Sequence, residues 1–489
     1  MIKRQVLAVD IGASSGRVML GSYNGEQIQI QELHRFPNDP VLLGDTMYWD
    51  FLRLFFEIKQ GLIKAKAYGA IDSIAVDTWG VDFGLLDEEG HLLANPVHYR
   101  DQRTVGMLAA AFEKIDRKKC YQITGNQIME INTVFQLLAL AGKKPKLLKD
   151  AKTLLFMPDL FHYYLSGTAK NEYSIASTSQ LLDAREKTWS KELFSALELP
   201  ADLMQEIIPS GTRLGMIRST LQKELGIGPM EVIAAAGHDT QSALVAVPAK
   251  EKDFIFISCG TWSLFGTELD APVINSLTEQ YNITNEGGYD GKTSFLKNII
   301  GLWLIQESRR QWIREGKEYS FGHLEQMAAH ATPFASLIDP DAPEFVPAGN
   351  IPERIREFCR RTGQNIPESA GSIVRCIHES LALKYRSALE EIKSCTGKSY
   401  QVIHMVGGGT QSTLLCQMTA NACACPVIAG PVEATVYGNA AVQLLAAGAI
   451  KNLEEARSLI AASEKTVRYE PQDIWKWEKI YQKLYEEER

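Results

Sequence analysis

The sequence predicts an α/β protein built from two similar halves, and three observations support this prediction. Short apolar runs with strand character alternate with longer segments of helical periodicity along all 489 residues. Each half has a glycine-rich turn between two apolar runs, at 10–17 and at 258–263. A similar order of elements follows each turn, which indicates a structural duplication with largely parallel sheets.

The first half reads as a strand, a tight turn and a return strand, followed by alternating elements. The clearest helix is amphipathic, because Leu54, Ile58 and Leu62 recur on one side of it. The expected elements are strands at 6–9, 18–20, 28–33, 71–76 and 83–86 and helices at 51–67 and 134–141. Gly142 ends the last of these helices.

The second half repeats this order from about residue 250. Its expected elements are strands at 254–257, 402–406 and 427–429 and helices at 302–314, 369–395, 413–422 and 435–447. Pro248 and a cluster of charges interrupt the apolar pattern near 245–252. We therefore expect two domains, at 1–247 and 248–489.

The composition is typical of a soluble globular protein, with 45% hydrophobic and 22% charged residues. The 51 Lys and Arg against 59 Asp and Glu give a net charge of −8, which argues against nucleic acid or an acidic membrane as a partner. We find no apolar run of membrane-spanning length, and Asp10 cuts the first apolar stretch too early for a signal peptide. Eight cysteines in a chain of this length are too few for a disulfide scaffold, which favours free thiols. Free thiols are typical of a protein in the reducing cytoplasm. A disulfide between Cys359 and Cys376 is left open.

The glycine-rich turns are suited to phosphate binding. Small residues let backbone N–H groups approach a ligand, and Arg17 adds a planar fork of donors. Asp10, at the end of the first strand, suits Mg²⁺ that bridges nucleotide phosphates. In the second half, the glycines at 407–409 offer bare backbone to a base or ribose. The structural alternatives are a turn-capping Asp10, a surface Arg17 and a tight connection at 407–409.

A second candidate site is the segment 237–240, which follows the apolar run 232–236. It therefore lies at the carboxyl end of a strand, where α/β proteins place ligands. Asp239 can orient a substrate hydroxyl and accept its proton during transfer to phosphorus. The alternative is that Asp239 or Thr240 opens the following helix as a cap.

Two further segments are more ambiguous. In 77–82, Trp79 can pack on a sugar ring while Asp77 or Asp82 accepts hydroxyl protons, although a buried core tryptophan is the usual explanation. The polar cluster at 99–103 reads as a solvated loop. Three isolated histidines are interpreted as structural, namely His98, His162 and His404.

Together these motifs resemble the FGGY carbohydrate kinases, members of the actin-like ATPase group, over almost the whole chain. Several matching motifs carry no obvious chemistry and act as fingerprints, at 9–20, 77–83, 157–159, 283–288, 296–299, 301–304 and 429–434. The resemblance implies two actin-like (ribonuclease H-like) domains with a nucleotide and sugar cleft between them. It implies phosphorylation of a ketose by ATP with Mg²⁺. L-Rhamnulose is the expected substrate, L-rhamnulose 1-phosphate the product, and L-fuculose or L-xylulose the alternatives.

The resemblance also implies roles for individual residues. Asp239 matches the catalytic base and Asp10 the aspartate associated with magnesium. The matching nucleotide contacts are Ala13, Ser14, Ser15, Gly16, Arg17, Thr261, Gln306 and Gly408. The matching sugar contacts are Gly80, His238, Asp239, Thr240 and Asn298. Ala13 departs from the wider family, where many members carry Thr, and this loses a hydroxyl near the phosphates.

A different class of protein remains as an alternative, namely a non-catalytic sugar sensor or a filament-forming actin relative. A sensor is expected to lose its catalytic carboxylates, yet Asp10 and Asp239 are both present. The expected partners are a ketose and ATP, without nucleic acid or membrane, and the expected assembly is a monomer or homodimer.

Overall fold

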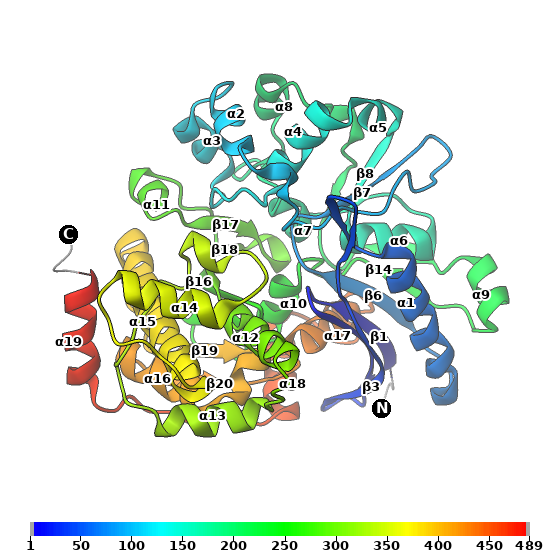
Figure 1. Cartoon of the computed structure of the whole chain (residues 1–489). Helices are drawn as coiled ribbons and strands as arrows, with labels where there is room; N and C mark the ends of the chain where they lie inside the picture. The colour runs from blue at the N-terminus through cyan, green and yellow to red at the C-terminus, as the bar shows by residue number, and fades with distance from the viewer. Residues whose placement is uncertain (1–3, 486–489) are drawn as a thin grey trace. The chain divides into compact units, whose positions relative to one another are not determined.

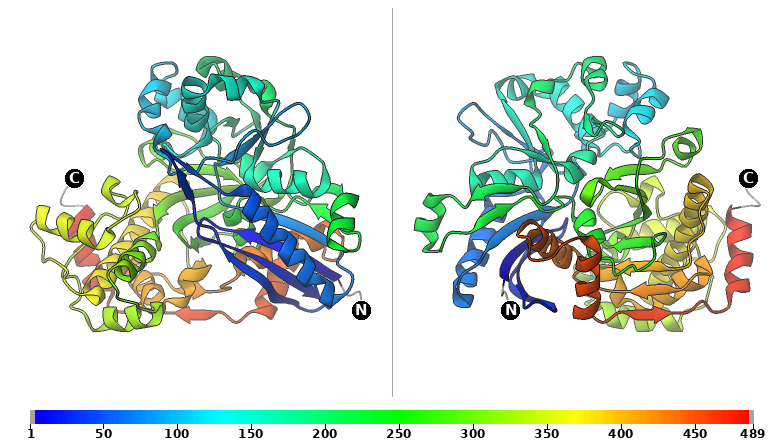
Figure 2. Two further views of the ribbon diagram at one scale, coloured as in Figure 1. Left: turned by 45° about the vertical axis from the view of Figure 1, so that its right-hand side comes forward. Right: turned by 180° about the vertical axis from the view of Figure 1, so that it is seen from behind.

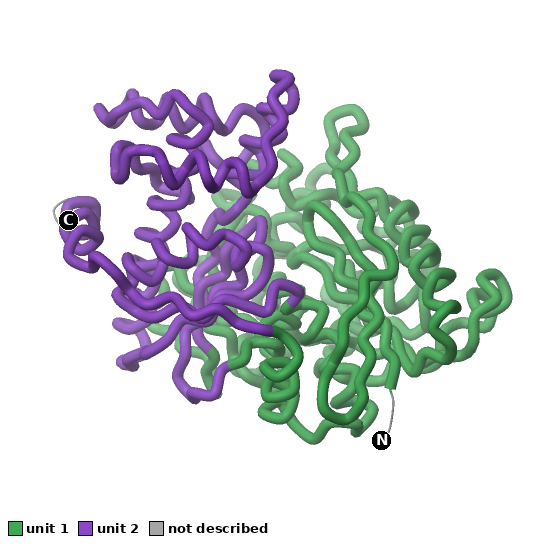
Figure 3. Tube along the Cα trace, turned by 90° about the horizontal axis from the view of Figure 1, so that it is seen from below, with its two compact units in different colours: residues 1–248, 268–295, 434–464 green, residues 249–267, 296–433, 465–489 purple. Residues whose placement is uncertain are grey.

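The computed structural model describes residues 4–485 and contains two compact units (Figure 3). The first unit consists of Met1–Pro248, Glu268–Phe295 and Ala434–Glu464. The second consists of Ala249–Thr267, Leu296–Glu433 and Lys465–Arg489. The chain therefore returns twice to the first unit after Pro248, and the domain boundary expected after residue 247 stays a prediction.

The first unit is built on a six-stranded sheet with the order β13-β14-β6-β1-β2-β3 (Figure 1). Its strands are β1 (Arg4–Ile11), β2 (Ser15–Tyr23), β3 (Ile28–Pro37), β6 (Ser73–Thr78), β13 (Arg213–Met216) and β14 (Glu231–Ile233). Strand β6 pairs in parallel with β1 and β14, and the other pairings are antiparallel. The glycine turn thus joins β1 and β2 as a hairpin, as predicted.

The second sheet has the order β17-β18-β16-β15-β19-β20-β21. Its strands are β15 (Ile255–Cys259), β16 (Trp262–Leu269), β17 (Thr284–Gly287), β18 (Thr293–Ile300), β19 (Ile403–Val406), β20 (Val427–Ala429) and β21 (Val467–Tyr469). Along β16-β15-β19-β20-β21 the successive pairings are antiparallel, parallel, parallel and antiparallel. The same series runs along β2-β1-β6-β14-β13 in the first sheet, so the predicted duplication is confirmed. The prediction of largely parallel sheets is wrong, because each sheet combines an antiparallel hairpin with parallel strands and an antiparallel edge.

Helices cover the sheets, and short strand pairs complete the first unit. The helices of the first unit are α1 (Phe51–Ala65), α2 (Met107–Phe112), α3 (Arg117–Thr124), α4 (Thr133–Lys143), α5 (Pro145–Asp150), α6 (Met157–Ser166), α7 (Tyr173–Ser177), α8 (Lys191–Leu197), α9 (Ser219–Leu225), α10 (Asp239–Val245), α11 (Ser276–Gln280), α17 (Ala434–Ala446) and α18 (Leu453–Ser463). Those of the second are α12 (Trp303–Arg314), α13 (Phe321–His330), α14 (Ile351–Arg361), α15 (Ala370–Thr396), α16 (Thr413–Cys423) and α19 (Ile474–Tyr485). The short strands form the pairs β4 (Val41–Leu43) with β5 (Thr46–Tyr48), β7 (Phe83–Leu86) with β8 (Thr153–Phe156), β9 (Asn171–Glu172) with β12 (Ile207–Ile208), and β10 (Leu182–Asp183) with β11 (Thr188–Trp189).

Helix α1 shows how the sequence pattern packs one face of the first sheet (Figure 2). Asp50 caps its start by accepting a hydrogen bond from the Arg53 N–H. Leu54, Ile58 and Leu62 are buried, as the periodicity predicts. Gly61 lets the helix approach β2, because a Cβ atom there would lie 2.4 Å from a methyl carbon of Val18.

The predicted helices of both halves are confirmed to within about two residues at each end. All eight cysteines are free thiols, so the structure contains no disulfide between Cys359 and Cys376. In the stretch from residue 4 to residue 485, no helix has the length and apolar character needed to cross a bilayer.

Candidate active site

Three aspartates of the first unit lie at the carboxyl ends of adjacent strands. Asp10 is near the end of β1, and Asp77 lies directly beside it on β6, in register. Asp239 begins helix α10, and a backbone bridge between Thr78 and His238 brings that helix to the end of β6. Asp10 and Asp77 are buried and Asp239 is half-buried. The α/β topology thus gathers carboxylates where such sheets place ligands.

The Asp77 carboxyl is the most deeply buried of the three. Its Oδ2 accepts a hydrogen bond from Asn439 Nδ2 at 2.6 Å, while its Oδ1 is buried without a partner among residues 4–485. Burial raises the pKa of Asp77 well above its usual value, the charge of Asp10 raises it further, and the Asn439 hydrogen bond opposes the shift. Asp10 itself accepts a hydrogen bond from Arg17 Nη2 at 2.7 Å.

Asp239 has the properties of a proton acceptor. Burial raises its pKa to about 6; His238 and the hydrogen bonds from Thr240 oppose this shift, whereas Asp10 adds to it. The carboxylate is therefore ionised at neutral pH but more basic than an ordinary aspartate. A general base is most effective when its pKa lies near the pH of the reaction.

A buried ion pair, formed by His238 and Glu286, lies next to Asp239. His238 Nδ1 lies 3.0 Å from Glu286 Oε2, and His238 Nε2 lies 3.5 Å from Asp239 Oδ1. Burial lowers the pKa of His238, but Glu286, Asp239 and Glu172 outweigh it and leave that pKa raised. Sequence reasoning missed Glu286, although it lies on β17 within the fingerprint motif 283–288.

Glu172 fixes the backbone that leads into α10. Its Oε2 accepts hydrogen bonds from the Gly237 N–H at 3.0 Å and from Ser174 Oγ at 2.6 Å, and its Oε1 accepts one from Ser210 Oγ at 2.6 Å. A Cβ atom at Gly237 would lie 3.1 Å from that same Oε2, so the absence of a side chain at this position leaves room for the Glu172 carboxylate. Nothing in the local sequence pattern identifies Glu172 as a partner of this turn.

The β1–β2 turn is the tight hairpin connection that the sequence predicts. Ala13, Ser14 and Ser15 are half-buried at its tip. Asn38 holds the turn by donating from Nδ2 to the Gly12 carbonyl at 2.8 Å. Gly16 makes room for the Phe36 ring, because a Cβ atom at this position would lie 2.2 Å from it.

The segment 77–82 divides into a site part and a core part. Asp77 belongs to the aspartate group, whereas Trp79 is buried and packs against Trp49, with ring centroids 4.0 Å apart and the rings tilted by 36°. Both indole N–H groups donate to Asp82 Oδ2, at 2.9 Å from Trp79 and 2.6 Å from Trp49. Trp79 is therefore a core residue, and Gly80 beside it is only half-buried.

The structure corrects one further sequence expectation and supports another. The cluster at 99–103 is not a solvated loop, since Tyr99 and Asp101 are buried. The expectation of a structural role for His162 agrees with its burial and with the hydrogen bond that its Nε2 accepts from the Val76 N–H at 2.9 Å.

The remaining predicted residues lie in the second unit. Thr261, in the β15–β16 turn, donates to Gln306 Oε1 at 3.2 Å, so these two are brought together. Gly408 is exposed, and a Cβ atom there would meet nothing within 4 Å, while a Cβ atom at Gly409 would lie 2.1 Å from Cys259 Sγ. Asn298 is half-buried on β18.

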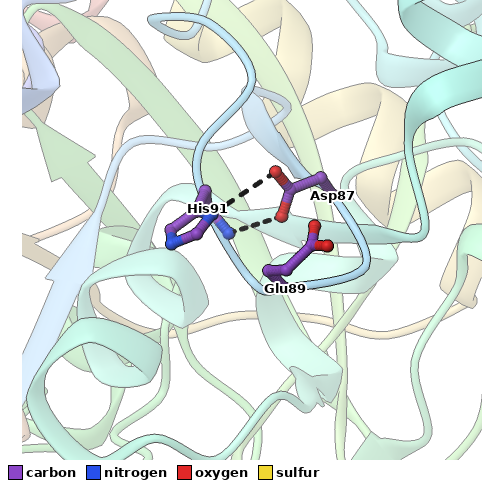
Figure 4. A group of neighbouring side chains, drawn as sticks. All are labelled: Asp87, Glu89 and His91. Atoms are coloured by element: carbon purple, nitrogen blue, oxygen red, sulfur yellow. Dashed lines mark hydrogen bonds and ion pairs between the residues drawn. The ribbon is translucent and has the colours of Figure 1, made fainter.

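A further cluster of two acidic residues and a histidine lies outside these sites. Asp87, Glu89 and His91 come together in the turn that follows β7 (Figure 4). Asp87 Oδ1 accepts a hydrogen bond from the His91 N–H at 2.8 Å, and His91 Nδ1 lies 3.5 Å from Asp87 Oδ2. The closure of the turn accounts for this arrangement.

The fold and the motifs together define a two-domain carbohydrate kinase. Residues 5–246 match the N-terminal domain, and residues 255–447 the C-terminal domain, of the FGGY family of carbohydrate kinases. The chain therefore belongs to the FGGY family of carbohydrate kinases. Among its relatives, the chain is 43% identical to the rhamnulokinase of Bacteroides thetaiotaomicron over 98% of both chains. It is 42% identical to that of Halalkalibacterium halodurans, over 95% of this chain and 98% of the relative.

Solved structures show the same fold at low sequence identity. The xylulose kinase of Lactobacillus acidophilus superposes with a TM-score of 0.79 at 17% identity, covering 98% of this chain and 96% of that one. The glycerol kinase of Plasmodium falciparum with ADP superposes with a TM-score of 0.77 at 15% identity, with the same two coverages.

Proposed function

We propose that this protein transfers the γ-phosphate of ATP to L-rhamnulose, giving L-rhamnulose 1-phosphate in rhamnose breakdown in the cytoplasm. Its family is one of carbohydrate kinases, and relatives about 40% identical over nearly the whole chain are rhamnulokinases. The observation that carries the chemistry is Asp239, a half-buried carboxylate of raised pKa beside the His238–Glu286 pair.

In this proposal Asp239 orients the attacking hydroxyl and accepts its proton. Phosphoryl transfer has a loose transition state, so the proton leaves late and alignment matters as much as basicity. His238, held by Glu286, fixes the direction of the Asp239 carboxylate and stabilises its ionised form. Gly80, Thr240 and Asn298 are proposed to contact the rest of the sugar.

We further propose that Asp10 helps to hold Mg²⁺. The oxygen donors of Asp10 and Asp77 fit this ion, and the buried, unpartnered Oδ1 of Asp77 is an atom that a nearby cation would stabilise. When bound, the ion supplies charge neutralisation at the nucleotide phosphates. The turn residues at 13–17 are proposed to donate backbone N–H groups to these phosphates, and Arg17 to add a charged donor.

In the second unit the proposed nucleotide contacts are Thr261, Gln306 and Gly408. The hydrogen bond from Thr261 to Gln306 supports a shared role for the first two. The open space at Gly408 supports contact with a flat group. A monomer or homodimer is proposed, and sedimentation with and without ATP distinguishes either from a filament.

The test is a panel of L-rhamnulose, L-fuculose and L-xylulose in an ADP-release assay. We expect kcat/KM to favour L-rhamnulose at least about tenfold, because pockets that hydrogen-bond hydroxyls discriminate strongly among sugars. The phosphorus spectrum of the product is expected to show a 1-phosphate. Equal or better turnover of another ketose identifies a sister kinase, and sugar binding without ADP release identifies a sensor.

A further inference from the structure

A cavity of about 410 Å³ opens in the first unit, and none of the three aspartates lines it. Phe83, Leu85 and Leu140, from β7 and α4, supply apolar walls. Its size falls within the range of small-molecule sites, and a mainly apolar wall with a few charged groups is their usual chemistry. No residue of the proposed kinase machinery lines it.

Arg103 is the unusual group in this cavity. Its Nη2 donates to Gln136 Oε1 at 2.5 Å, and its Nε is buried without a partner among residues 4–485. The guanidinium lies over the Phe83 ring, 6.0 Å from the ring centroid, but no described carboxylate forms an ion pair with it. Burial lowers the pKa of Arg103, and the charges of Asp82 and Asp101 oppose this shift. A guanidinium stays charged in proteins, and buried charges are normally paired.

The other charges around the cavity do not supply the missing partner. Asp101 lines the cavity, but its carboxylate accepts hydrogen bonds from the backbone N–H groups of Met47 and Arg103, each at 2.8 Å. Asp45, the second acidic residue of the lining, is exposed. Lys143 and Lys144 stand at the rim, exposed, so cations outnumber carboxylates.

We infer that this cavity binds a small amphipathic organic anion, with its charged head at Arg103 and its apolar body against Phe83, Leu85 and Leu140. A planar fork of N–H donors suits a carboxylate, sulfonate or phosphate head. The chain of contacts continues inward, because Gln136 Nε2 donates to Asp82 Oδ1 at 2.9 Å and the Asp82 N–H donates to the Gly80 carbonyl at 2.9 Å. If the bound anion also regulates the sugar site through Gly80, that effect rests on the proposed function. Binding of the anion in the cavity does not depend on the proposed function.

The binding test uses the full chain and the fluorescent probe 8-anilinonaphthalene-1-sulfonate, an aromatic body with one anionic head. Its neutral counterpart, N-phenyl-1-naphthylamine, has the same apolar body without the charge. We expect one saturable site per chain for the sulfonate and at least about tenfold weaker binding of the neutral probe. Equal affinity for the two probes overturns the inference.

Charge variants locate the probe. Arg103→Gln is expected to weaken sulfonate binding at least about tenfold, and Lys144→Glu about threefold or more. The matched control is Lys146→Glu, because Lys146 is an exposed lysine of the same segment that does not line the cavity. Circular dichroism melting checks each fold. If Arg103→Gln unfolds, the contrast between Lys144→Glu and Lys146→Glu decides, and equal binding by those two overturns the inference. Since no readout uses turnover, failure here is separate from failure of the kinase proposal.

Discussion

At the residue scale, the site depends on a carboxylate whose surroundings make it basic. Asp239→Asn keeps the shape of the side chain but removes its capacity to accept a proton. We expect kcat to fall by about 10²–10⁴-fold with L-rhamnulose, the range of a general base. The melting temperature is expected to stay near that of the wild type, since the helix start keeps a polar residue. Wild-type turnover by the variant removes Asp239 from the mechanism.

The same residue predicts the acid side of the pH profile. The pKa of Asp239 is raised to about 6, chiefly by burial, and only the ionised carboxylate accepts a proton. As pH falls through about 6, the carboxylate becomes protonated, so kcat/KM is expected to fall about tenfold per unit below that value. Initial rates between pH 5 and pH 8 measure it, with the coupling enzymes in excess at each pH. A profile that stays flat down to pH 5 contradicts the assignment.

Asn439 predicts a stability effect at the same scale. Its Nδ2 donates to Asp77, and its Oδ1 accepts from Gln443 Nε2 at 2.7 Å, in a fully buried position. Asn439→Ala removes the donor of Asp77 Oδ2 and one of the two acceptors of Gln443 Nε2, so we expect the free energy of unfolding in urea to fall by about 1–3 kcal/mol. The matched control is Gln472→Ala, at an exposed amide, with an expected change within about 0.5 kcal/mol. Equal stability of the two variants contradicts the buried role.

At the element scale, helices α10 and α17 pack so closely that one glycine decides their contact. A Cβ atom at Gly438 would lie 1.7 Å from the Ser242 carbonyl oxygen. Gly438→Ala is expected to cost about 1–3 kcal/mol of stability and to lower turnover, because α10 carries Asp239. Gly142→Ala, in open space on α4, is the matched control and is expected to stabilise by up to about 1 kcal/mol. Chemical denaturation and initial rates compare them, and similar behaviour contradicts the packing argument.

Elements differ in how far the sequence predicts them. The hairpins and the long helices are local patterns of glycine and apolar residues, and the structure confirms them. The partners of Asp77 and Asp239 are not local, since Asn439 and Glu286 arrive from distant segments. No spacing rule connects those residues, and only the family fingerprint at 283–288 marks Glu286. For the same reason the sequence predicts Arg103 to lie in a solvated loop, although the residues around it are buried.

At the scale of the whole molecule, the first unit is completed by a segment from the end of the chain. Helix α17 lies against β1 and β6, and Gln443 ties them together by donating to the Leu7 carbonyl at 3.0 Å and accepting from Ser73 Oγ at 2.6 Å (Figure 1). Helix α18 adds a bond from the Ile28 N–H to Ser463 Oγ at 2.9 Å. The first 248 residues therefore lack part of their own core.

A chain that ends at residue 433 is accordingly expected to lose the native state of the first unit. Amide hydrogen exchange of β1 and β6 is expected to rise by at least about 10²-fold, since exchange then proceeds through global opening of that unit. The matched truncation ends at residue 469 and removes α19, whose Trp477 and Tyr481 pack within the second unit. It is expected to leave protection of β1 and β6 unchanged, because none of the contacts of α17 is lost. Native protection of β1 in the shorter chain contradicts the view that residues 434–464 are an integral part of the first unit.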